Sequence, residues 1–560
     1  MRTRRIGCAA ALLLVIVPGA AARSSARLNA IQQENARRGD AAWSAPYARV
    51  GSVEGYTSEA AVDPGGAVRL HVSMRPAGSY RVRLIRLGWY AGAGGRTLAC
   101  IPSCTGSEAG APQPLPAMND NTGEVAADWP VTDTIAVPEH AVSGYYLVQL
   151  QVVGGSEDGR VQDVPLVVRA PAEQQSRVLV QVPINTWEGY NPWGGSCVYP
   201  RPVCERQAFY VSFDRPYAWE STGHNPLHWE LPLVHFLERS GVDLAYQTDA
   251  DTDADPTSLL RHRLVMTAGH GEYWTKGMFD AFDAARDAGT NLAFMGSNTD
   301  YWQIRYQLDR RRIVSFKNWD NDPEADPALK TVRFSDLRPP RYECELMGVQ
   351  HLGGSYTHAV DDYTVSPAAA RDPWFRGTGF KPGDTVSQIV SGERDDIPPG
   401  QEPGKACGHP MTILFSHAQT VQLQAAVSLR YLAASGARVF STGSHDFAAG
   451  LDATTAPNRD DPRLERFMLN ALDDLGRPAA PLLTVELAGR RVHVVVVPAA
   501  DTRIRTTLVF RLSHGRRTLI RCRRGGCFDR PRKGRCRYAA VSLDRWGRSY
   551  PALSELLRVP

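Results

Sequence analysis

Hydrophobic and polar residues alternate in several short segments of the first third of the chain. The alternation is clear at residues 67–73 and 80–86, and further strands are expected at 145–153 and 164–169. Glycine and proline residues separate these segments. Short alternating strands with turns between them are typical of a β-sandwich, which we predict for residues 50–170.

The pattern changes near residue 177. Continuous apolar stretches now predict buried strands, and segments with helical spacing lie between them. The strands are expected at 177–183, 263–268, 291–296 and 438–442, and the helices at 228–240, 276–287 and 421–434. Buried strands alternating with amphipathic helices predict an α/β layered, catalytic-type domain with a mostly parallel sheet at 175–478. Within it, residues 303–410 are rich in proline and glycine and are expected to form a loop-rich insertion.

Strand patterning returns at 483–487 and 491–497, which predicts a small C-terminal β domain at 480–560. The predicted fold class is therefore mixed α/β and all-β. A basic run at 516–537 belongs to this last region. A solvated hairpin face explains the run best, and binding of an anionic wall polymer is the alternative.

The N-terminus has the pattern of an export signal. Arg2, Arg4 and Arg5 precede a short apolar run, and small residues follow at 20–22. This predicts a signal peptide at 1–22, a linker at 23–49, with a short helix as the alternative at 23–39, and a secreted or extracytoplasmic protein. An uncleaved N-terminal anchor is the alternative. No later apolar run is long enough to span a membrane, so no membrane span is expected after signal cleavage.

Composition excludes one class of partner. The 560 residues include 63 Lys and Arg against 59 Asp and Glu, a net charge of +4. This near balance gives no field for binding nucleic acid, so no nucleic-acid partner is expected.

The ten cysteines agree with export, because disulfides persist in oxidising compartments. Short spacings predict the bridges Cys100–Cys104 and Cys197–Cys204. Cys344 and Cys407 form a further set. Cys522, Cys527 and Cys536 form an odd set, for which a zinc site without a histidine ligand is the alternative to disulfide pairing.

Polar and aromatic residues follow each predicted strand of the α/β domain. The strands lead into residues 185–195, Gly269-His270-Gly271-Glu272, Gly296-Ser297-Asn298 and Gly443-Ser444-His445-Asp446. Ligands collect at the carboxyl ends of strands in open α/β sheets, so these turns are the candidate site. The chain has no Gly-x-Ser-x-Gly, no His-Glu-x-x-His and no phosphate-binding glycine loop.

Several longer motifs point to one family. They are Gly55-Tyr-Thr-Ser58, Arg86-Leu-Gly-Trp-Tyr90, Asn185-Thr-Trp-Glu-Gly-Tyr-Asn191, Ser212-Phe-Asp-Arg-Pro216, Gly269-His-Gly-Glu-Tyr-Trp274 and Asn298-Thr-Asp-Tyr-Trp302. In this order they resemble the large (beta) subunit of N,N-dimethylformamidase and its relatives, over roughly residues 50–475.

The resemblance implies a hydrolase that cleaves a small formamide at a mononuclear non-haem iron, Fe3+. Two tyrosinates and one glutamate hold the iron in that family. Carried onto this chain, the ligands are Tyr146, Tyr190 and Glu272. The register near Tyr146 is open by one residue, so Tyr145 is the alternative. Three anionic oxygens form a hard site that suits ferric iron.

The resemblance also implies four catalytic residues: Glu393, His270, Asn298 and Lys317. Glu393 would accept or pass a proton. Asn298 and Lys317 would polarise the substrate carbonyl. His270 would orient the carboxylate of Glu272.

Two functional hypotheses follow. The first is an exported metal-dependent amidohydrolase that acts on a small amide substrate. The second is a non-catalytic exported carbohydrate- or cell-wall-binding protein with a degenerate enzyme domain. The family enzyme works with a small partner subunit, which this sequence does not identify, and a homo-oligomer is an alternative assembly.

Overall fold

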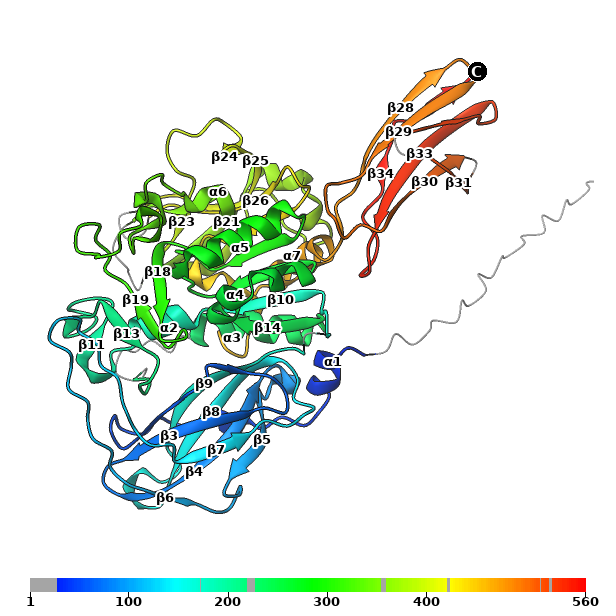
Figure 1. Ribbon diagram of the computed structural model, residues 1–560. Helices are drawn as coiled ribbons and strands as arrows, with labels where there is room; N and C mark the ends of the chain where they lie inside the picture. The colour runs from blue at the N-terminus through cyan, green and yellow to red at the C-terminus, as the bar shows by residue number, and fades with distance from the viewer. Residues whose placement is uncertain are drawn as a thin grey trace, which may run out of the picture.

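The computed structural model describes residues 28–171, 173–218, 227–353, 359–420, 424–513, 515–522 and 526–560. It combines helices and strands, with an all-β part at each end and a mixed part between them (Figure 1). The predicted mixture of α/β and all-β structure is confirmed. The signal peptide predicted at 1–22 lies outside the described residues.

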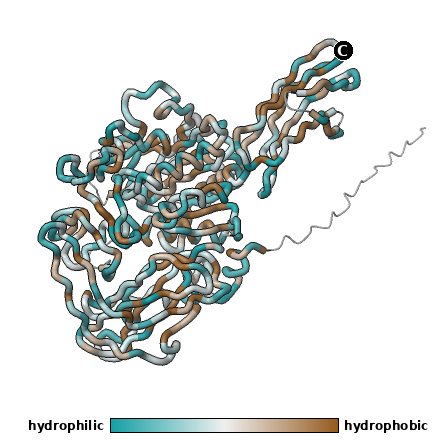
Figure 2. The backbone as a smooth tube through the Cα atoms, in the orientation of Figure 1, coloured by the Kyte–Doolittle hydropathy of each residue, from teal (hydrophilic) through white to brown (hydrophobic). Residues whose placement is uncertain are grey.

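Two facing sheets form the N-terminal part. One contains β1 (Val53–Thr57), β3 (Ala67–Met74) and β7 (Asp133–Ala136). The other contains β2 (Ala61–Val62), β9 (Val161–Val168), β8 (Gly144–Val153), β4 (Gly78–Leu87), β5 (Gly95–Ile101) and β6 (Glu108–Gly110). Their inward side chains, such as Leu70 of β3 and Leu84 of β4, form one buried cluster. Hydrophobic stretches follow these strands in Figure 2. A core enclosed by two sheets is the arrangement of a β-sandwich.

Residues 28–49 pack against the protein, and the short helix expected as the alternative to a linker is present in this stretch. Helix α1 (Ala30–Asn35) buries Ile31, which is 1% exposed. The side-chain amide of Asn29 donates to the carbonyl of Gly241, and Glu34 accepts a hydrogen bond from Tyr90. Burial of Ile31 and these distant contacts hold the segment in place.

A ten-stranded sheet organises the central part, in the order β14-β10-β15-β17-β27-β26-β25-β21-β22, with β24 paired to β25. The strands are β14 (Leu244–Thr248), β10 (Val178–Val182), β15 (Leu264–Ala268), β17 (Asn291–Met295), β27 (Arg438–Ser441), β26 (Ala426–Leu432), β25 (His409–His417), β21 (Val360–Val365), β22 (Thr385–Ser391) and β24 (Lys405–Ala406). Pairing is parallel from β14 to β27 and antiparallel beyond it. The sheet is therefore mixed, and the expectation of a mostly parallel sheet is wrong for its second half.

Two local predictions fail in that second half. The helix expected at 421–434 is instead strand β26 within its described residues. Helical spacing in so short an apolar run is a weak signal, and here pairing with β25 and β27 decides. The expected insertion at 303–410 supplies strands β21 and β22 to the sheet, with Tyr363 and Ile389 buried in the core.

Helices cover both faces of this sheet. Helices α3 (Leu227–Arg239) and α7 (Pro462–Leu475) share one buried cluster with the sheet, and α5 (Lys276–Asp287) belongs to the cluster on the other face. The helix predicted at 276–287 is confirmed. It begins where Thr275 accepts a hydrogen bond from the backbone of Met278, an N-cap that satisfies a free amide.

Two small sheets form the C-terminal part, which projects from the central part in Figure 1. They contain β28 (Leu482–Ala488), β29 (Arg491–Val497) and β32 (Cys527–Asp529), and β31 (Arg516–Ile520), β30 (Thr506–Ser513), β33 (Gly534–Leu543), β34 (Ala552–Leu553) and β35 (Leu557–Val559). Arg263, at the start of β15, forms ion pairs with Asp501 and Asp544 from this part, and all three side chains are buried.

The described residues contain four disulfides. Cys100–Cys104 and Cys197–Cys204 are confirmed, and Cys344–Cys407 and Cys522–Cys527 complete the set. Cys536 remains a buried thiol. The alternative of a zinc site at Cys522, Cys527 and Cys536 is wrong because two of its ligands are bonded to each other. Among the described residues, no helix has both the length and the apolar character that a bilayer crossing requires.

Arg263→Met tests the link to the C-terminal part. The substitution leaves the carboxylates of Asp501 and Asp544 buried with one guanidinium fewer, and breaking a buried pair costs about 3–5 kcal/mol. We expect a lower melting temperature and faster proteolysis near residues 476–482. The half-exposed pair of Arg333 and Asp336 is the control, and Arg333→Met should change neither measurement. Equal behaviour of the two variants would contradict the prediction.

His262→Gln tests a pH-dependent contribution to stability. Burial lowers the pKa of His262 to about 4, and its ring Nδ1 bonds to the carbonyl of Ser176. The unfolded chain binds the extra proton between about pH 6.5 and 4, so stability falls as the pH falls through this window. The contribution is up to about 3 kcal/mol. Urea unfolding at pH 7 and pH 4.5 should show a smaller difference for the variant than for the unchanged protein.

Candidate functional site

The candidate site lies where several strands of the central sheet end. Strands β10, β15, β17 and β27 are parallel and therefore end at one edge. Strand β22 is separated from β27 by an even number of antiparallel pairings and points the same way. Glu272, Asn298, Glu393 and His445 follow β15, β17, β22 and β27 in the chain. Topology therefore brings these residues together.

The turn after β15 carries His270 and Glu272 and leads into β16 (Tyr273–Thr275). It packs tightly on the turn after β17, because a Cβ added at Gly296 would lie 1.8 Å from the carbonyl oxygen of Gly269. The backbone amide of Glu272 donates to the hydroxyl of Thr186 in α2 (Ile184–Tyr190). These contacts hold the carboxylate of Glu272, which is 1% exposed, at the sheet edge.

Two tyrosines face this carboxylate. Tyr199 donates from its hydroxyl to Oε1 of Glu272 over 2.5 Å. Tyr190 ends α2, and its ring centre lies 5.1 Å from that of Tyr199 and 5.6 Å from that of His270. Tyr199 lies inside the loop closed by Cys197–Cys204, so the disulfide restrains its position.

Tyr146 is not part of this cluster, which corrects the ligand set expected from the resemblance. Its hydroxyl donates to the carbonyl of Val142 over 2.7 Å, and its ring lies in the sandwich core. Tyr145 does not replace it, because its ring packs against Trp187 and Tyr246. Strand alternation sends the two side chains to opposite faces of β8, and neither face presents a hydroxyl to Glu272. The second tyrosine beside Glu272 in the structure is Tyr199.

His270 and Glu393 form a buried pair beside Glu272. Nε2 of His270 lies 3.0 Å from Oε2 of Glu393 and 3.6 Å from Oε2 of Glu272. The side-chain amide of Asn298 donates to the same oxygen of Glu393 over 2.6 Å. Burial opposes charge on His270, but the hydrogen bond and charge of Glu393 outweigh it and raise the pKa of His270. Burial likewise works to raise the pKa of Glu393, but His270 holds that pKa well below its usual range. The pair therefore shares one proton in an ionic hydrogen bond.

Lys317 also contacts the tyrosines of the site. Its ammonium group donates to the hydroxyl of Tyr273 over 2.6 Å and lies 3.2 Å from the ring centre of Tyr199. Burial lowers the pKa of Lys317 to about 7, although the carboxylates of Glu272 and Glu393 oppose the shift. Lys317 and Asn298 both have positive φ, 55° and 47°. Such backbone strain in residues other than glycine concentrates at functional sites.

The charges at this edge are incompletely balanced. Oε2 of Glu272 is buried and has no hydrogen-bond partner among the described residues. Burial and then the charge of Glu272 raise the pKa of both Tyr190 and Tyr199 well above the usual value. The hydroxyls of Tyr190 and Tyr199 therefore stay protonated unless a cation binds to them. A buried, unpaired carboxylate oxygen beside two phenols is a place where a cation would be stabilised.

The structure thus brings together six of the seven predicted site residues: Tyr190, Glu272, His270, Asn298, Lys317 and Glu393. Sequence reasoning missed Tyr199, although its position two residues after Cys197 in a predicted disulfide loop was a usable signal. It also left His445 without a role. That ring is 1% exposed, and its centre lies 4.4 Å from the ring centre of His270.

A comparison with protein families gives one match. Residues 81–461, more than half of the chain, match the family model described as N,N-dimethylformamidase beta subunit-like, C-terminal. The chain belongs to this family. A comparison with curated proteins found no match.

The family match includes every residue of the cluster and ends before the C-terminal sheets. The donors present at the cluster fit the ferric iron that the resemblance implies. Tyr190, Tyr199 and Glu272 offer three oxygen ligands of the hard type, and Oε2 of Glu272 has no hydrogen-bond partner among the described residues.

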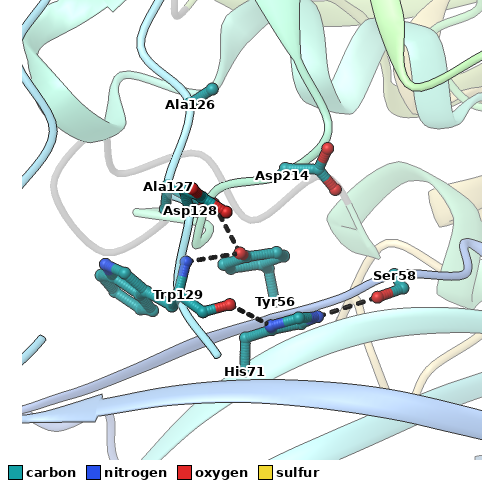
Figure 3. Close-up of a pocket in the computed structure, with 8 residues that line it drawn as sticks. All are labelled: Tyr56, Ser58, His71, Ala126, Ala127, Asp128, Trp129 and Asp214. Carbon is teal, nitrogen blue, oxygen red and sulfur yellow. Dashed lines mark hydrogen bonds between the residues drawn. The ribbon is translucent and has the colours of Figure 1, made fainter. Parts of the chain in front are cut away.

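A cavity of about 360 Å³ lies elsewhere, where the sandwich meets the loop after β13 (Tyr210–Ser212). Figure 3 shows Tyr56, Ser58 and His71 on its wall, and Asp214 opposite. Nδ1 of His71 donates to the carbonyl of Trp129 over 2.7 Å, and Nε2 forms a hydrogen bond with the hydroxyl of Ser58 over 2.8 Å. Both ring nitrogens of His71 therefore have hydrogen-bond partners. The motif Gly55-Tyr-Thr-Ser58 lies at the contact between the sandwich and the central part.

Proposed function

We propose that this protein is an exported hydrolase that cleaves the C–N bond of a small carboxamide, with a mononuclear iron held by Tyr190, Tyr199 and Glu272. The observation that carries the proposal is the 2.5 Å contact between Tyr199 and Glu272 beside the ring of Tyr190. Membership of the N,N-dimethylformamidase beta subunit-like family supports the reaction type.

A ferric ion bound by these three oxygens would supply Lewis-acid chemistry to the site. The protein's own residues supply the remaining functions. Ring packing among Tyr190, Tyr199 and Tyr273 excludes water from the carboxylate of Glu272. Charge interactions are stronger in such a dry site than in water.

The pair of His270 and Glu393 is the proton carrier of the proposed reaction. It gives the proton shared between Nε2 and Oε2 to the departing amine and takes a proton from the attacking water in its place. One C–O bond forms and one C–N bond breaks, which gives a carboxylic acid and an amine. Asn298 keeps Glu393 in position through its 2.6 Å hydrogen bond.

Lys317 is the positive group available for the negative charge that develops on the carbonyl oxygen. Its pKa of about 7 means that roughly half of the molecules carry this charge at neutral pH. The rings of Tyr199 and Trp302 hold the ammonium group by cation–π contacts at 3.2 and 4.7 Å.

Export and assembly belong to the same proposal. Four disulfides support folding in an oxidising compartment. The family description names a beta subunit, which supports the expectation of a partner subunit. The small size of the expected substrate agrees with a reaction centre enclosed by tyrosine rings.

Tyr199→Phe tests the metal ligands. The unchanged protein, supplied with iron, should show the visible absorption of tyrosinate bound to ferric iron, because phenolate donates charge to the metal. The variant should lose at least about half of this absorption and bind iron at least about tenfold more weakly. Tyr146→Phe is the matched control and should retain both. A colourless, iron-free unchanged protein would favour the non-catalytic binding protein instead.

Glu393→Gln tests the proton carrier. Glutamine keeps the size of the side chain but cannot take the proton, so kcat should fall about 10²- to 10⁴-fold while the iron absorption remains. A panel of small formamides and acetamides, assayed for released amine, provides the measurement. Glu402→Gln, at an exposed salt bridge with Lys405, is the control and should keep full activity. Retained turnover in Glu393→Gln would remove Glu393 from the mechanism.

A further inference from the structure

A second set of possible metal ligands lies next to the tyrosines. His270, Glu393 and His445 come from the ends of β15, β22 and β27, and one ligand atom from each lies within 4.8 Å of the other two. His270 and Glu393 already touch at 3.0 Å. The third member, His445, has no part in the proposed reaction.

The ring of His445 has an unusual environment. Both of its nitrogens are buried, and neither reaches a hydrogen-bond partner among the residues that the structure describes. Trp229 packs on the ring with a centre-to-centre distance of 4.8 Å, and His270 lies on it at 4.4 Å. Burying a polar group without a partner costs free energy, so an imidazole held this way requires an explanation.

The backbone around Glu393 makes room for this ring. A Cβ added at Gly392 would lie 2.5 Å from Nδ1 of His445, and Gly392 has φ of +63°. Only glycine combines that backbone conformation with that close approach. The glycine therefore lets His445 and the neighbouring Glu393 lie side by side.

We propose that His270, Glu393 and His445 bind a divalent cation of borderline character, with Zn2+ as the best fit, beside the oxygen ligands of Tyr190, Tyr199 and Glu272. Two imidazoles and one carboxylate are the donors that zinc takes in many proteins. They are softer than the tyrosine and glutamate oxygens, so the two sets prefer different ions. The cation would give the unpartnered ring of His445 its missing contact.

Occupation of this second set has a consequence that rests on the proposed function. The cation would occupy the position between Nε2 of His270 and Oε2 of Glu393 and so interrupt their direct contact. The same two residues then cannot carry a proton to the departing amine. Zinc binding should therefore inhibit amide hydrolysis reversibly, and a chelator should restore it.

The test uses the full chain after chelator treatment, with Co2+ as a visible probe and Zn2+ as its competitor. Co2+ bound to histidine and carboxylate absorbs in the visible range, so a titration measures affinity directly. We expect saturable binding to the unchanged protein. His445→Asn should bind Co2+ at least about tenfold more weakly, because it removes one of three ligands. His409→Asn, at a stacked histidine on β25 with 4.2 Å to the ring of Tyr431, is the control and should bind normally.

Two further variants separate this proposal from the proposed function. Tyr199→Phe should lose iron absorption yet keep Co2+ binding, and His445→Asn should show the opposite. If the unchanged protein binds no Co2+, or if Tyr199→Phe rather than His445→Asn abolishes binding, the second site is overturned while the iron result stands on its own. If His445→Asn has a lower melting temperature than the unchanged protein, Glu393→Gln is used as a second variant that removes a ligand. Undiminished Co2+ binding in Glu393→Gln would also overturn the proposal.

Discussion

Parallel strands that share a sheet end at the same edge, and the candidate site depends on that constraint. Strands β10, β15, β17 and β27 run in one direction. Strand β22 runs in the same direction, because an even number of antiparallel pairings separates it from β27. Their following turns carry carboxylate, imidazole, amide and phenol groups. Residues more than one hundred positions apart, such as Glu272 and Glu393, thereby meet around one imidazole.

Burial makes these groups interdependent. Away from water, His270 and Glu393 shift each other's pKa values, and the charges of Glu272 and Glu393 oppose the fall that burial causes in the pKa of Lys317. The tyrosine rings add bulk and oxygen ligands without adding charge while they remain phenols. The edge therefore contains two adjacent ligand sets, one of hard oxygens and one with two imidazoles. Donor chemistry, and not the fold, decides which ion each set would prefer.

Buried ion pairs connect this edge to the rest of the protein. Arg86 of β4 pairs with Glu238 of α3 at 2.7 Å with both side chains fully buried, which joins the sandwich to the central part. Arg263 connects the central sheet to the C-terminal strands through Asp501 and Asp544. Such pairs are costly to break because each leaves a buried charge behind. Each all-β part is therefore held to the central sheet by charge as well as by apolar contact.

Local pattern by itself determined the alternating strands of the sandwich, the strands β10, β15, β17 and β27, the helix α5 with its Thr275 cap, and two short disulfides. These features depend on residues close in sequence. Glu272, His270 and Asn298 stood in motifs that follow predicted strands, and the family resemblance alone pointed to Glu393. Tertiary structure alone decided that β26 is a strand, since its pairing with β25 and β27 outweighs a weak helical pattern. It also decided that Tyr199 and not Tyr146 faces Glu272, because the disulfide loop and the direction of a side chain from β8 are settled only when distant segments pack together.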